Sequence, residues 1–391
     1  MLSGSVQMVK GRIRPITCKV ANNSSGNSDG QSDGNVQKPQ TSAGVAAREL
    51  QKCRTSTDKK GNGGGGNRAK PISTEWSKSQ SIAKSSPQKN FVKELNGLSS
   101  DVAKVLREEG YVIGKSIGEG SYCKVRVAYK SFDNGPDKKI ACKMIDKRKA
   151  SDDFVVKFLP RELGIIKRLS HPNIVSVFDV FEIDSIVFIF MEICEHGDLL
   201  DYIRNKGALP ENRAKNLFRQ IVSAVEYLHS LDIAHRDLKC ENVLLAKRDL
   251  VKITDFGFAR WCKNDDGQRI LSETFCGSAA YAAPEIIQGH AYNPKMYDIW
   301  SLGCVLYIML TATMPFDDSN VAQMLEIQLT KSLTFPSKSQ LLISPLAKKL
   351  VMHLLAPDVT RRATLAQITK SFWLQRSCTL LPKMAVSSGK R

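Results

Sequence analysis

A short stretch near the middle of the chain carries the residues that most constrain its fold. Asp237 is followed two positions later by Lys239 and five positions later by Asn242, and Asp255 comes thirteen positions after that asparagine, next to a phenylalanine and a glycine. Carboxylate and amide oxygens are suitable ligands for magnesium, another carboxylate can orient a hydroxyl, and an ammonium can neutralise phosphate. The stretch therefore predicts phosphoryl transfer, in a fold that brings these side chains together.

Composition divides the chain into a polar N-terminal part and a more apolar remainder. Residues 1 to about 97 are rich in Ser, Gly, Asn, Gln and Lys, and Trp76 and Phe91 are their only aromatic residues. Such a segment buries too little apolar surface to offset its chain entropy. We expect a disordered basic tail over residues 1–97, a folded domain over 98–374 and a short C-terminal tail over 375–391.

The chain is strongly basic, with a formal net charge of +18, and residues 1–110 hold 18 Lys and Arg against 9 Asp and Glu. In the tail, glycine and serine dilute these charges, and almost no aromatic side chains are present to stack on bases. We therefore favour a solvated tail over a nucleic-acid-binding module. The latter would predict salt-dependent retention of residues 1–97 on nucleic acid. The acid-free first 28 residues weakly resemble a mitochondrial transit peptide, and again we favour the solvated tail.

The ten cysteines contain no C-x-x-C pair, and several lie in apolar runs, as Cys304 does. This pattern is typical of reduced thiols and favours the cytoplasm, with the nucleus as the second location. No apolar run approaches the roughly 18 residues that a membrane span needs. The N-terminus has neither a signal-peptide core nor a glycine at position 2, so we expect no membrane partner.

Hydrophobic periodicity predicts the order of elements in the folded part. Alternating apolar residues predict strands, and a spacing of three and four predicts helices. The expected strands cover residues 111–117, 125–129, 139–145, 174–178 and 186–191, and the expected helices cover 155–169, 214–228 and 297–310. We expect an α+β architecture of two lobes, the first with five strands and one main helix, the second mostly helical.

Gly118 and Gly120 lie between the first two expected strands. Glycines there let backbone amides approach phosphate oxygens, although an ordinary hairpin turn can carry the same pattern. Lys143 favours the phosphate interpretation, because an ammonium at the end of an apolar strand needs an anion.

Several motifs resemble those of the eukaryotic protein kinases. Residues 235–242 match the H-R-D-L-x-x-x-N signature, and residues 255–257 match D-F-G. Residues 140–143 resemble V-A-I-K, residues 283–285 read A-P-E, and residues from about 111 to 373 resemble a complete kinase domain. Further stretches are similar to the testis-specific serine/threonine kinases of the calmodulin-dependent-kinase group: 117–122, 158–162, 196–203 and 277–285.

The resemblance implies a serine/threonine kinase that uses magnesium-ATP, acts on protein substrates and serves sperm development. It implies that Asp237 orients the substrate hydroxyl and that Lys239 neutralises the γ-phosphate and marks serine/threonine specificity. Asn242 and Asp255 would hold Mg²⁺. The implied nucleotide-binding residues are Ile117, Gly118, Gly120, Val125, Ala141, Lys143, Glu162, Glu192, Cys194, Asp198 and Leu244.

The resemblance also implies structural partners. Glu162 would pair with Lys143, Glu285 would pair with Arg362, and Asp298 would hold the backbone of the 235–242 loop. Cys123 stands where such glycine loops usually carry their third glycine. We expect a less flexible loop that still binds ATP. A reactive thiol over the nucleotide is the alternative, and we favour an ordinary small residue.

Arg236 and Arg260 suggest regulation by phosphorylation. Two neighbouring guanidiniums repel each other and would favour a phosphate between them. We predict Thr274 as the activating phosphosite, modified by an upstream kinase or by autophosphorylation, with Ser272 as the second candidate. A helix residue that often joins this cluster in kinases corresponds to Phe158, which predicts a weaker phosphate pocket.

Two further expectations concern substrate choice and catalysis. Asp198 and Glu241 suggest a preference for Arg upstream of the phosphoacceptor, although Asp198 could instead bond the ribose. A pseudokinase scaffold without catalysis is the alternative function. Pseudokinases usually lack at least one of five residues, and this chain has them all: Lys143, Glu162, Asp237, Asn242 and Asp255. We therefore favour the active enzyme.

Overall fold

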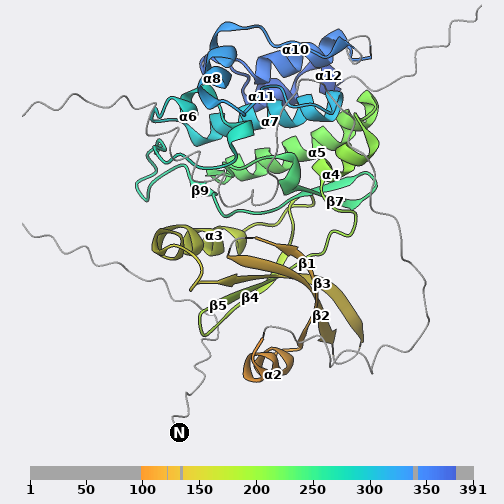
Figure 1. The fold of residues 1–391 in the computed structure, drawn as a ribbon, viewed down its shortest axis with the longest axis vertical. Coiled ribbons are helices and arrows are strands. Elements are labelled where there is room, and N and C mark those ends of the chain that lie inside the picture. The colour runs from red at the N-terminus through yellow and green to blue at the C-terminus, as the bar shows by residue number, and fades with distance from the viewer. Residues whose placement is uncertain (1–97, 121, 133–134, 338–341, 376–391) are drawn as a thin grey trace, which may run out of the picture. The chain divides into compact units, whose positions relative to one another are not determined.

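The computed structural model describes residues 98–120, 122–132, 135–337 and 342–375, which fall into two compact units (Figure 1). Within the described residues, the first unit comprises the stretch up to residue 150 together with 178–191, and the second comprises 151–177 and 192–375. The predicted tails over 1–97 and beyond 375 lie outside the described residues. The described residues include seven cysteines, all of them free. Within the same residues, no helix is long and apolar enough to cross a membrane.

The first unit is built on a five-stranded sheet, as the sequence predicted. Its strands lie in the order β1-β2-β3-β5-β4, and the pairs β1/β2, β2/β3 and β3/β5 are antiparallel. The strand bounds are β1 Tyr111–Glu119, β2 Cys123–Phe132, β3 Gly135–Asp146, β4 Val177–Ile183 and β5 Ile186–Met191.

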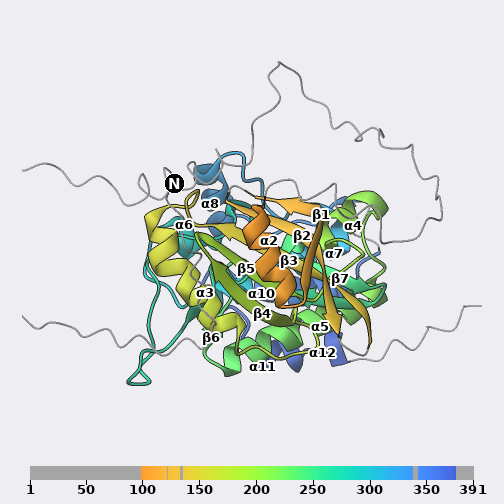
Figure 2. The same cartoon turned by 90° about the horizontal axis from the view of Figure 1, so that it is seen from below.

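A helix that the sequence did not lead us to expect, α2 (Ser100–Glu108), lies across one face of this sheet (Figure 2). Its buried residues Val102 and Leu106 share an apolar cluster with Tyr111, whose ring stacks on Phe190 at a centroid distance of 3.8 Å. The signals were present in the sequence: Ser99 caps the N-terminus by accepting the Val102 N–H, and the apolar residues recur at helical spacing.

The second unit is mostly helical, as predicted. A π-helical turn, Phe154–Phe158, leads into its first α-helix. The bounds are α3 Leu159–Ile166, α4 Leu199–Lys206, α5 Glu211–Ser230, α6 Pro284–Ile287, α7 Pro294–Thr311, α8 Val321–Thr330, α10 Pro345–Leu354, α11 Leu365–Thr369 and α12 Phe372–Gln375. Four short strands form two pairs, β6 Ile233–Ala234 with β9 Arg260–Trp261 and β7 Val243–Lys247 with β8 Leu250–Ile253.

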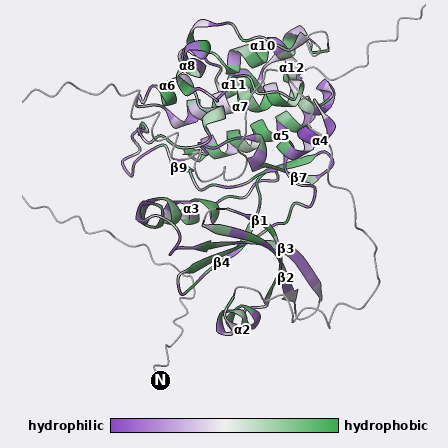
Figure 3. Cartoon of the chain, viewed as in Figure 1, coloured by the Kyte–Doolittle hydropathy of each residue, from purple (hydrophilic) through white to green (hydrophobic). Residues whose placement is uncertain are grey.

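Helix α7 forms the centre of this unit. Sixteen of its 18 residues are buried, which is expected of a helix that is apolar on all sides. Gly303 permits close packing, since a Cβ there would lie 2.7 Å from a Leu355 side-chain carbon. Helix α5 instead carries both hydrophobic and hydrophilic residues, and its buried positions recur at three and four (Figure 3). Both helices were predicted from their periodicity.

The fourth strand is displaced from its predicted position. The sequence indicated 174–178, whereas β4 covers Val177–Ile183. Ile174 instead forms an isolated parallel bridge with Ile253, and the Val175 N–H donates to the Ile253 carbonyl at 2.9 Å. Both stretches are rich in β-branched residues, so local propensity could not separate them, and tertiary pairing decides.

Candidate active site

Asp298 of α7 holds the backbone of the 235–242 loop, as the sequence predicted. Its fully buried carboxylate accepts hydrogen bonds from the His235 N–H at 2.9 Å and the Arg236 N–H at 2.8 Å, and it lies 2.8 Å from His229 Nε2. Arg236 has a φ of 65°, a left-handed conformation that costs about 1–2 kcal/mol for a residue with a Cβ. The two hydrogen bonds to Asp298 stabilise this conformation, and with it the position of Asp237.

The Asp237 carboxylate is 4% exposed and is surrounded by donors. Its Oδ1 accepts the Ser278 N–H and hydroxyl, both at 3.0 Å. Its Oδ2 lies 2.9 Å from Lys239 Nζ and accepts from Asn242 Nδ2 at 3.1 Å. The structure therefore brings together Asp237, Lys239 and Asn242. It adds Ser278, whose hydroxyl also accepts from Lys239 Nζ at 2.8 Å.

Gly277 makes this approach of Ser278 possible. Its φ of 92° is left-handed, and a Cβ would lie 2.6 Å from the Arg236 carbonyl oxygen and 2.7 Å from Tyr297 Oη. In the sequence, the Gly277-Ser278 pair, together with Lys239, indicated a similarity to serine/threonine kinases. The direct contact between Ser278 and Asp237 was not predicted.

Lys239 stays protonated in this setting. Burial alone would lower the pKa of its ammonium, but the negative charges of Asp237, Glu241 and Asp255 outweigh burial and raise that pKa. A fixed positive charge beside Asp237 is suited to neutralising the charge on a phosphoryl group during its transfer.

Asn242 and Asp255 offer the oxygen donors that a magnesium ion prefers. The backbone N–H of Thr254, directly before Asp255, donates to the Asn242 carbonyl at 3.0 Å, so the two residues are held together. Because the Asn242 side-chain nitrogen donates to Asp237, its amide oxygen points the other way. One carboxylate and one amide oxygen fit a Mg²⁺ that takes its remaining ligands from phosphate and water. Among the described residues no cluster of three or more His, Cys, Asp or Glu could hold a metal.

In the first unit, the predicted nucleotide residues lie in a row across the sheet. Gly118 pairs with Val125, Val125 pairs with Lys143, and Ala141 precedes Lys143 by two positions on β3. Cross-strand partners and residues two apart share a face of the sheet, so Val125, Ala141 and Lys143 present one common face.

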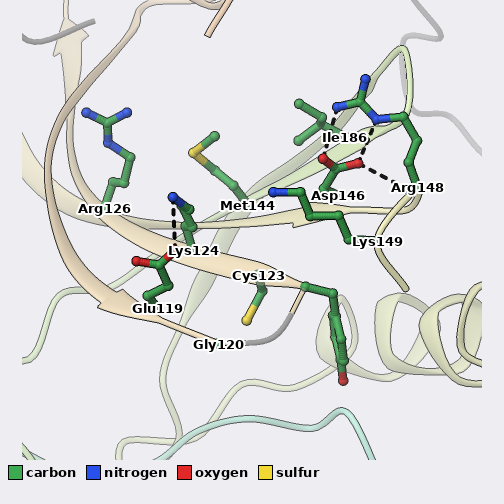
Figure 4. A pocket seen from close by; sticks show the side chains of 11 residues that line it. Glu119, Gly120, Cys123, Lys124, Arg126, Met144, Asp146, Arg148, Lys149 and Ile186 are labelled. Atoms are coloured by element: carbon green, nitrogen blue, oxygen red, sulfur yellow. Dashed lines mark hydrogen bonds and ion pairs between the residues drawn. The ribbon is translucent and has the colours of Figure 1, made fainter. Parts of the chain in front are cut away.

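A cavity of about 340 Å³ lies at the tip of the glycine loop (Figure 4). Lys124 and Met144, which pair across β2 and β3, line it together with Ile186. Since they alternate with Val125 and Lys143 along their strands, they belong to the opposite face. Gly120, a predicted nucleotide residue, also lines the cavity, whereas Val125, Ala141 and Lys143 do not.

Cys123 closes the glycine loop. Its carbonyl accepts the Gly120 N–H at 2.8 Å, and a Cβ on residue 120 would lie 3.1 Å from its sulfur. The thiol thus lies against Gly120, and the reduced flexibility of the loop stays a prediction.

The remaining predicted nucleotide residues lie on the second unit, apart from Ile117, which is 48% exposed on β1. Glu162 is buried on α3 at 3% exposure. Asp198 caps α4 by accepting the Asp201 N–H at 2.8 Å, and burial raises the pKa of its carboxyl. Leu244 on β7 forms a bridge with Asp198.

The hinge segment Glu192–Cys194 adjoins β8. The Glu192 carboxylate lies 2.9 Å from Lys252 Nζ. Burial, followed by the Glu192 charge, raises the pKa of the Cys194 thiol to about 11. Lys252 was not identified from the sequence.

Arg236 and Arg260 converge as predicted, but on Ser272. Its hydroxyl, fully buried, accepts from Arg236 Nη1 at 2.8 Å and from Arg260 Nη1 at 3.0 Å. Thr274 is exposed, and its carbonyl accepts the Tyr292 hydroxyl at 3.0 Å.

A third guanidinium, Arg161 of α3, joins this cluster. Burial, followed by the positive charges of Arg236 and Arg260, lowers the pKa of Arg161. Phe158, the position expected from the kinase resemblance to weaken the pocket, packs edge-on against Phe258 at 6.1 Å. Residue 158, where the kinase resemblance led us to expect a member of the phosphate-binding cluster, is a phenylalanine. Arg161, three residues later, supplies a positive charge to the cluster instead.

Two buried contacts fix the end of the segment that begins at Asp255. Arg362 donates to both Glu285 oxygens, at 2.7 and 2.9 Å, which confirms the predicted ion pair. Tyr281 accepts the Cys240 N–H at 3.3 Å and donates to Glu241 at 3.1 Å.

Comparisons with known proteins agree with this arrangement. The family model described as "protein kinase domain" matches residues 111–374. The chain is 47% identical over 292 residues to testis-specific serine/threonine-protein kinase 1 of Mus musculus, covering 73% of this chain and 78% of the relative. It is 46% identical over 270 residues to testis-specific serine/threonine-protein kinase 3 of the same species, covering 69% and 97%.

A plant protein is similar at greater distance. CBL-interacting protein kinase 31 of Oryza sativa subsp. japonica is 36% identical over 274 residues, covering 70% of this chain and 59% of the relative. With the family model spanning well over half of the sequence, and with testis-specific relatives matched over most of their length, the chain belongs to the protein kinase family, among its serine/threonine-specific members.

Proposed function

We propose that this chain is a catalytically active kinase that transfers the γ-phosphate of ATP to serine and threonine hydroxyls of proteins. The observation that carries the proposal is the Asp237 carboxylate, held by Ser278, Asn242 and Lys239 at 2.9–3.1 Å. A carboxylate fixed from several sides can orient a substrate hydroxyl without rearrangement during the reaction.

The roles of the chain's own residues derive from this geometry. Asp237 orients the hydroxyl and accepts its proton as the oxygen bonds to the γ-phosphorus. The bond from that phosphorus to the β–γ bridging oxygen breaks, and ADP leaves. Lys239, fixed beside Asp237, neutralises charge on the phosphoryl group. Asn242 and Asp255 would hold Mg²⁺, which supplies charge neutralisation on the phosphates when bound.

Transfer of radiolabelled phosphate from ATP to a generic protein substrate tests the proposal. We expect Asp237→Asn to lose roughly a hundredfold or more in rate. Asp232→Asn is the matched control, because Asp232 pairs with Lys263 and Lys295 away from these residues and should keep near wild-type activity. Equal incorporation by wild type and Asp237→Asn would refute catalysis by this site, and a wild type that binds ATP without transfer would favour a pseudokinase scaffold.

We also propose that phosphorylation of Thr274 activates the enzyme. Thr274 is exposed, whereas Ser272 is fully buried and thus inaccessible to another kinase in the folded state. Three guanidiniums in one cluster favour an anion, and a phosphate on the nearby Thr274 would supply it.

Activity before and after phosphatase treatment tests this regulation. We expect phosphatase to lower wild-type activity roughly fivefold or more and to leave Thr274→Ala unchanged at the low level. Purified Asp237→Asn, which should be unable to phosphorylate itself, distinguishes an upstream kinase from autophosphorylation. Incubated with ATP, it should gain phosphate on Thr274 only when an upstream kinase is added. A Thr274→Ala variant with wild-type turnover would contradict the proposal.

A preference for Arg upstream of the phosphoacceptor rests on Glu241, whose carboxylate is oriented by Tyr281. Asp198 is the weaker candidate, because its carboxylate caps α4. A peptide array should show less selection for Arg with Glu241→Gln than with wild type. An array without any basic preference for the wild type would remove this proposal.

The similarity to testis-specific kinases supports a role in sperm development. We further propose a cytoplasmic enzyme, with the nucleus as the second location, whose kinase domain spans 98–374 between two tails. Immunostaining of testis sections and fractionated germ cells would test both the tissue and the compartment.

A further inference from the structure

The hinge residue Glu192 is held from two directions. Its backbone N–H donates to the Ser176 carbonyl at 2.8 Å. Its carboxylate Oε2 lies 2.9 Å from Lys252 Nζ and accepts the Ser176 N–H at 3.4 Å. The two Ser176 contacts fix the backbone at this point, and the lysine fixes the direction of the side chain.

Lys252 is a buried cation whose ion pair is with Glu192. Its side chain is 9% exposed and that of Glu192 is 30% exposed. A buried ammonium without its counter-ion is strongly unfavourable, so removal of either partner leaves an uncompensated charge. The ammonium also affects the pKa values of two neighbouring groups. Burial is the larger cause of the lowered pKa of His171, and Lys252 lowers it further. At Cys194, Lys252 opposes the rise in pKa that burial and Glu192 cause.

The position of Lys252 on β8 connects three parts of the proposed nucleotide site. It pairs across the ladder with Leu244 on β7, a predicted nucleotide contact. It precedes the metal-binding candidate Asp255 by three residues. The next residue, Ile253, donates to the Asn173 carbonyl at 2.8 Å, in the same segment that continues to Ser176 and the hinge.

We propose that Lys252 is a positioning residue for nucleotide binding. It holds the Glu192 carboxylate, and through it the hinge backbone, in a fixed relation to the strand that leads to Asp255. Lys252 touches neither the substrate hydroxyl nor the γ-phosphate in this scheme, so it acts on nucleotide affinity more than on the transfer step. The inference rests on the proposed function, and on the expectation from the sequence that Glu192 and Cys194 contribute to ATP binding.

The full-length chain provides the test, with ADP affinity measured by calorimetry and the KM for ATP and kcat measured by phosphate transfer. We expect Lys252→Met to weaken ADP binding and raise the KM roughly tenfold, the loss expected from one weakened hydrogen bond to a charged group, while kcat changes less than about threefold. Lys252→Arg should recover most of the affinity. Lys247→Met, at the exposed end of β7, is the matched control and should behave as wild type.

The partner variant Glu192→Gln keeps the size of the hinge side chain and tests the same contact should Lys252→Met fail to fold. The effects of Glu192→Gln and Lys252→Met should not add in the double variant, because both remove one interaction. ADP affinity of folded Lys252→Met or of Glu192→Gln within about twofold of wild type would overturn the inference, as would a loss confined to kcat. A wild type that binds ADP but transfers no phosphate would refute the proposed function alone, since the affinity comparison would still decide the role of Lys252.

Discussion

Replacement of Gly277 by alanine gives the most direct test of how the site is assembled. Gly277 has a φ of 92°, and a Cβ there would lie 2.6 Å from the Arg236 carbonyl oxygen and 2.7 Å from Tyr297 Oη. The left-handed backbone costs about 1–2 kcal/mol for an L-residue. Overpacking against backbone and a buried hydroxyl adds about 1–3 kcal/mol. We therefore expect Gly277→Ala to lower the free energy of unfolding by about 2–5 kcal/mol.

Activity should fall for a separate reason. Relief of the clash moves Ser278, and its N–H then no longer reaches the Asp237 carboxylate from 3.0 Å. A hydrogen bond to a charged group contributes about 1.5–3 kcal/mol, so kcat should fall roughly 10- to 100-fold if the bond is needed in the transition state.

Gly267 supplies the matched control within the same segment. Its φ is 78°, but nothing lies within 4 Å of a Cβ added there. Gly267→Ala therefore carries the backbone strain without the clash, and it should lose about 1–2 kcal/mol of stability with little change in kcat. Urea denaturation and steady-state kinetics of both variants, at a temperature where each is folded, separate the two effects. Equal stability losses and wild-type kcat for both would refute the reasoning about Gly277 and Ser278.

Three further predictions concern stability. Arg362→Met should lose about 3–5 kcal/mol in urea denaturation by leaving Glu285 buried and unpaired, and the double variant with Glu285→Met should lose less than the sum; additive losses would contradict a direct pair. Burial, followed by the charge of Lys252, lowers the pKa of His171 below 6.5, so as the pH falls the unfolded chain binds a proton before the folded chain does. The stability that this neutral histidine contributes above pH 6.5 is therefore lost as the pH falls through the folded pKa. His171→Gln should flatten this part of the stability–pH curve, and an unchanged slope would contradict the assignment to His171. Ser99→Ala should cost about 1 kcal/mol by removing the α2 N-cap, and an unchanged denaturation midpoint would contradict that role.

The sequence predicted the centre of the site well because the residues there are close in the chain. Asp237, Lys239 and Asn242 lie within six positions, so their relative placement depends on one loop. Contacts that depend on distant segments were harder to predict. Lys252 carried no motif, and its role depends on the pairing of β7 with β8 and on the neighbouring segment 173–176.

Periodicity predicted element types better than their partners. Of the ten residues from Ile174 to Ile183, seven are apolar and five are β-branched. Which part joins the sheet is decided by Ile253, whose backbone pairs with Ile174 and Val175 and leaves the later residues to β4. No local signal in the sequence specifies that competition.

Arg161 shows that a cation absent from one helix position can be supplied from the position three residues later. The regular helix α3 follows the π turn Phe154–Phe158, and residues three positions apart on an α-helix, such as 158 and 161, lie on the same side. The Arg161 guanidinium lies 5.9 Å from the Phe158 ring centroid, so the two side chains share one side of the helix. An aromatic at 158 therefore does not remove the cation from the phosphate pocket, because Arg161 reaches the same cluster with Phe158 as its support. On these grounds Arg161→Met should reduce the activation caused by Thr274 phosphorylation, whereas Phe158→Leu should largely retain it.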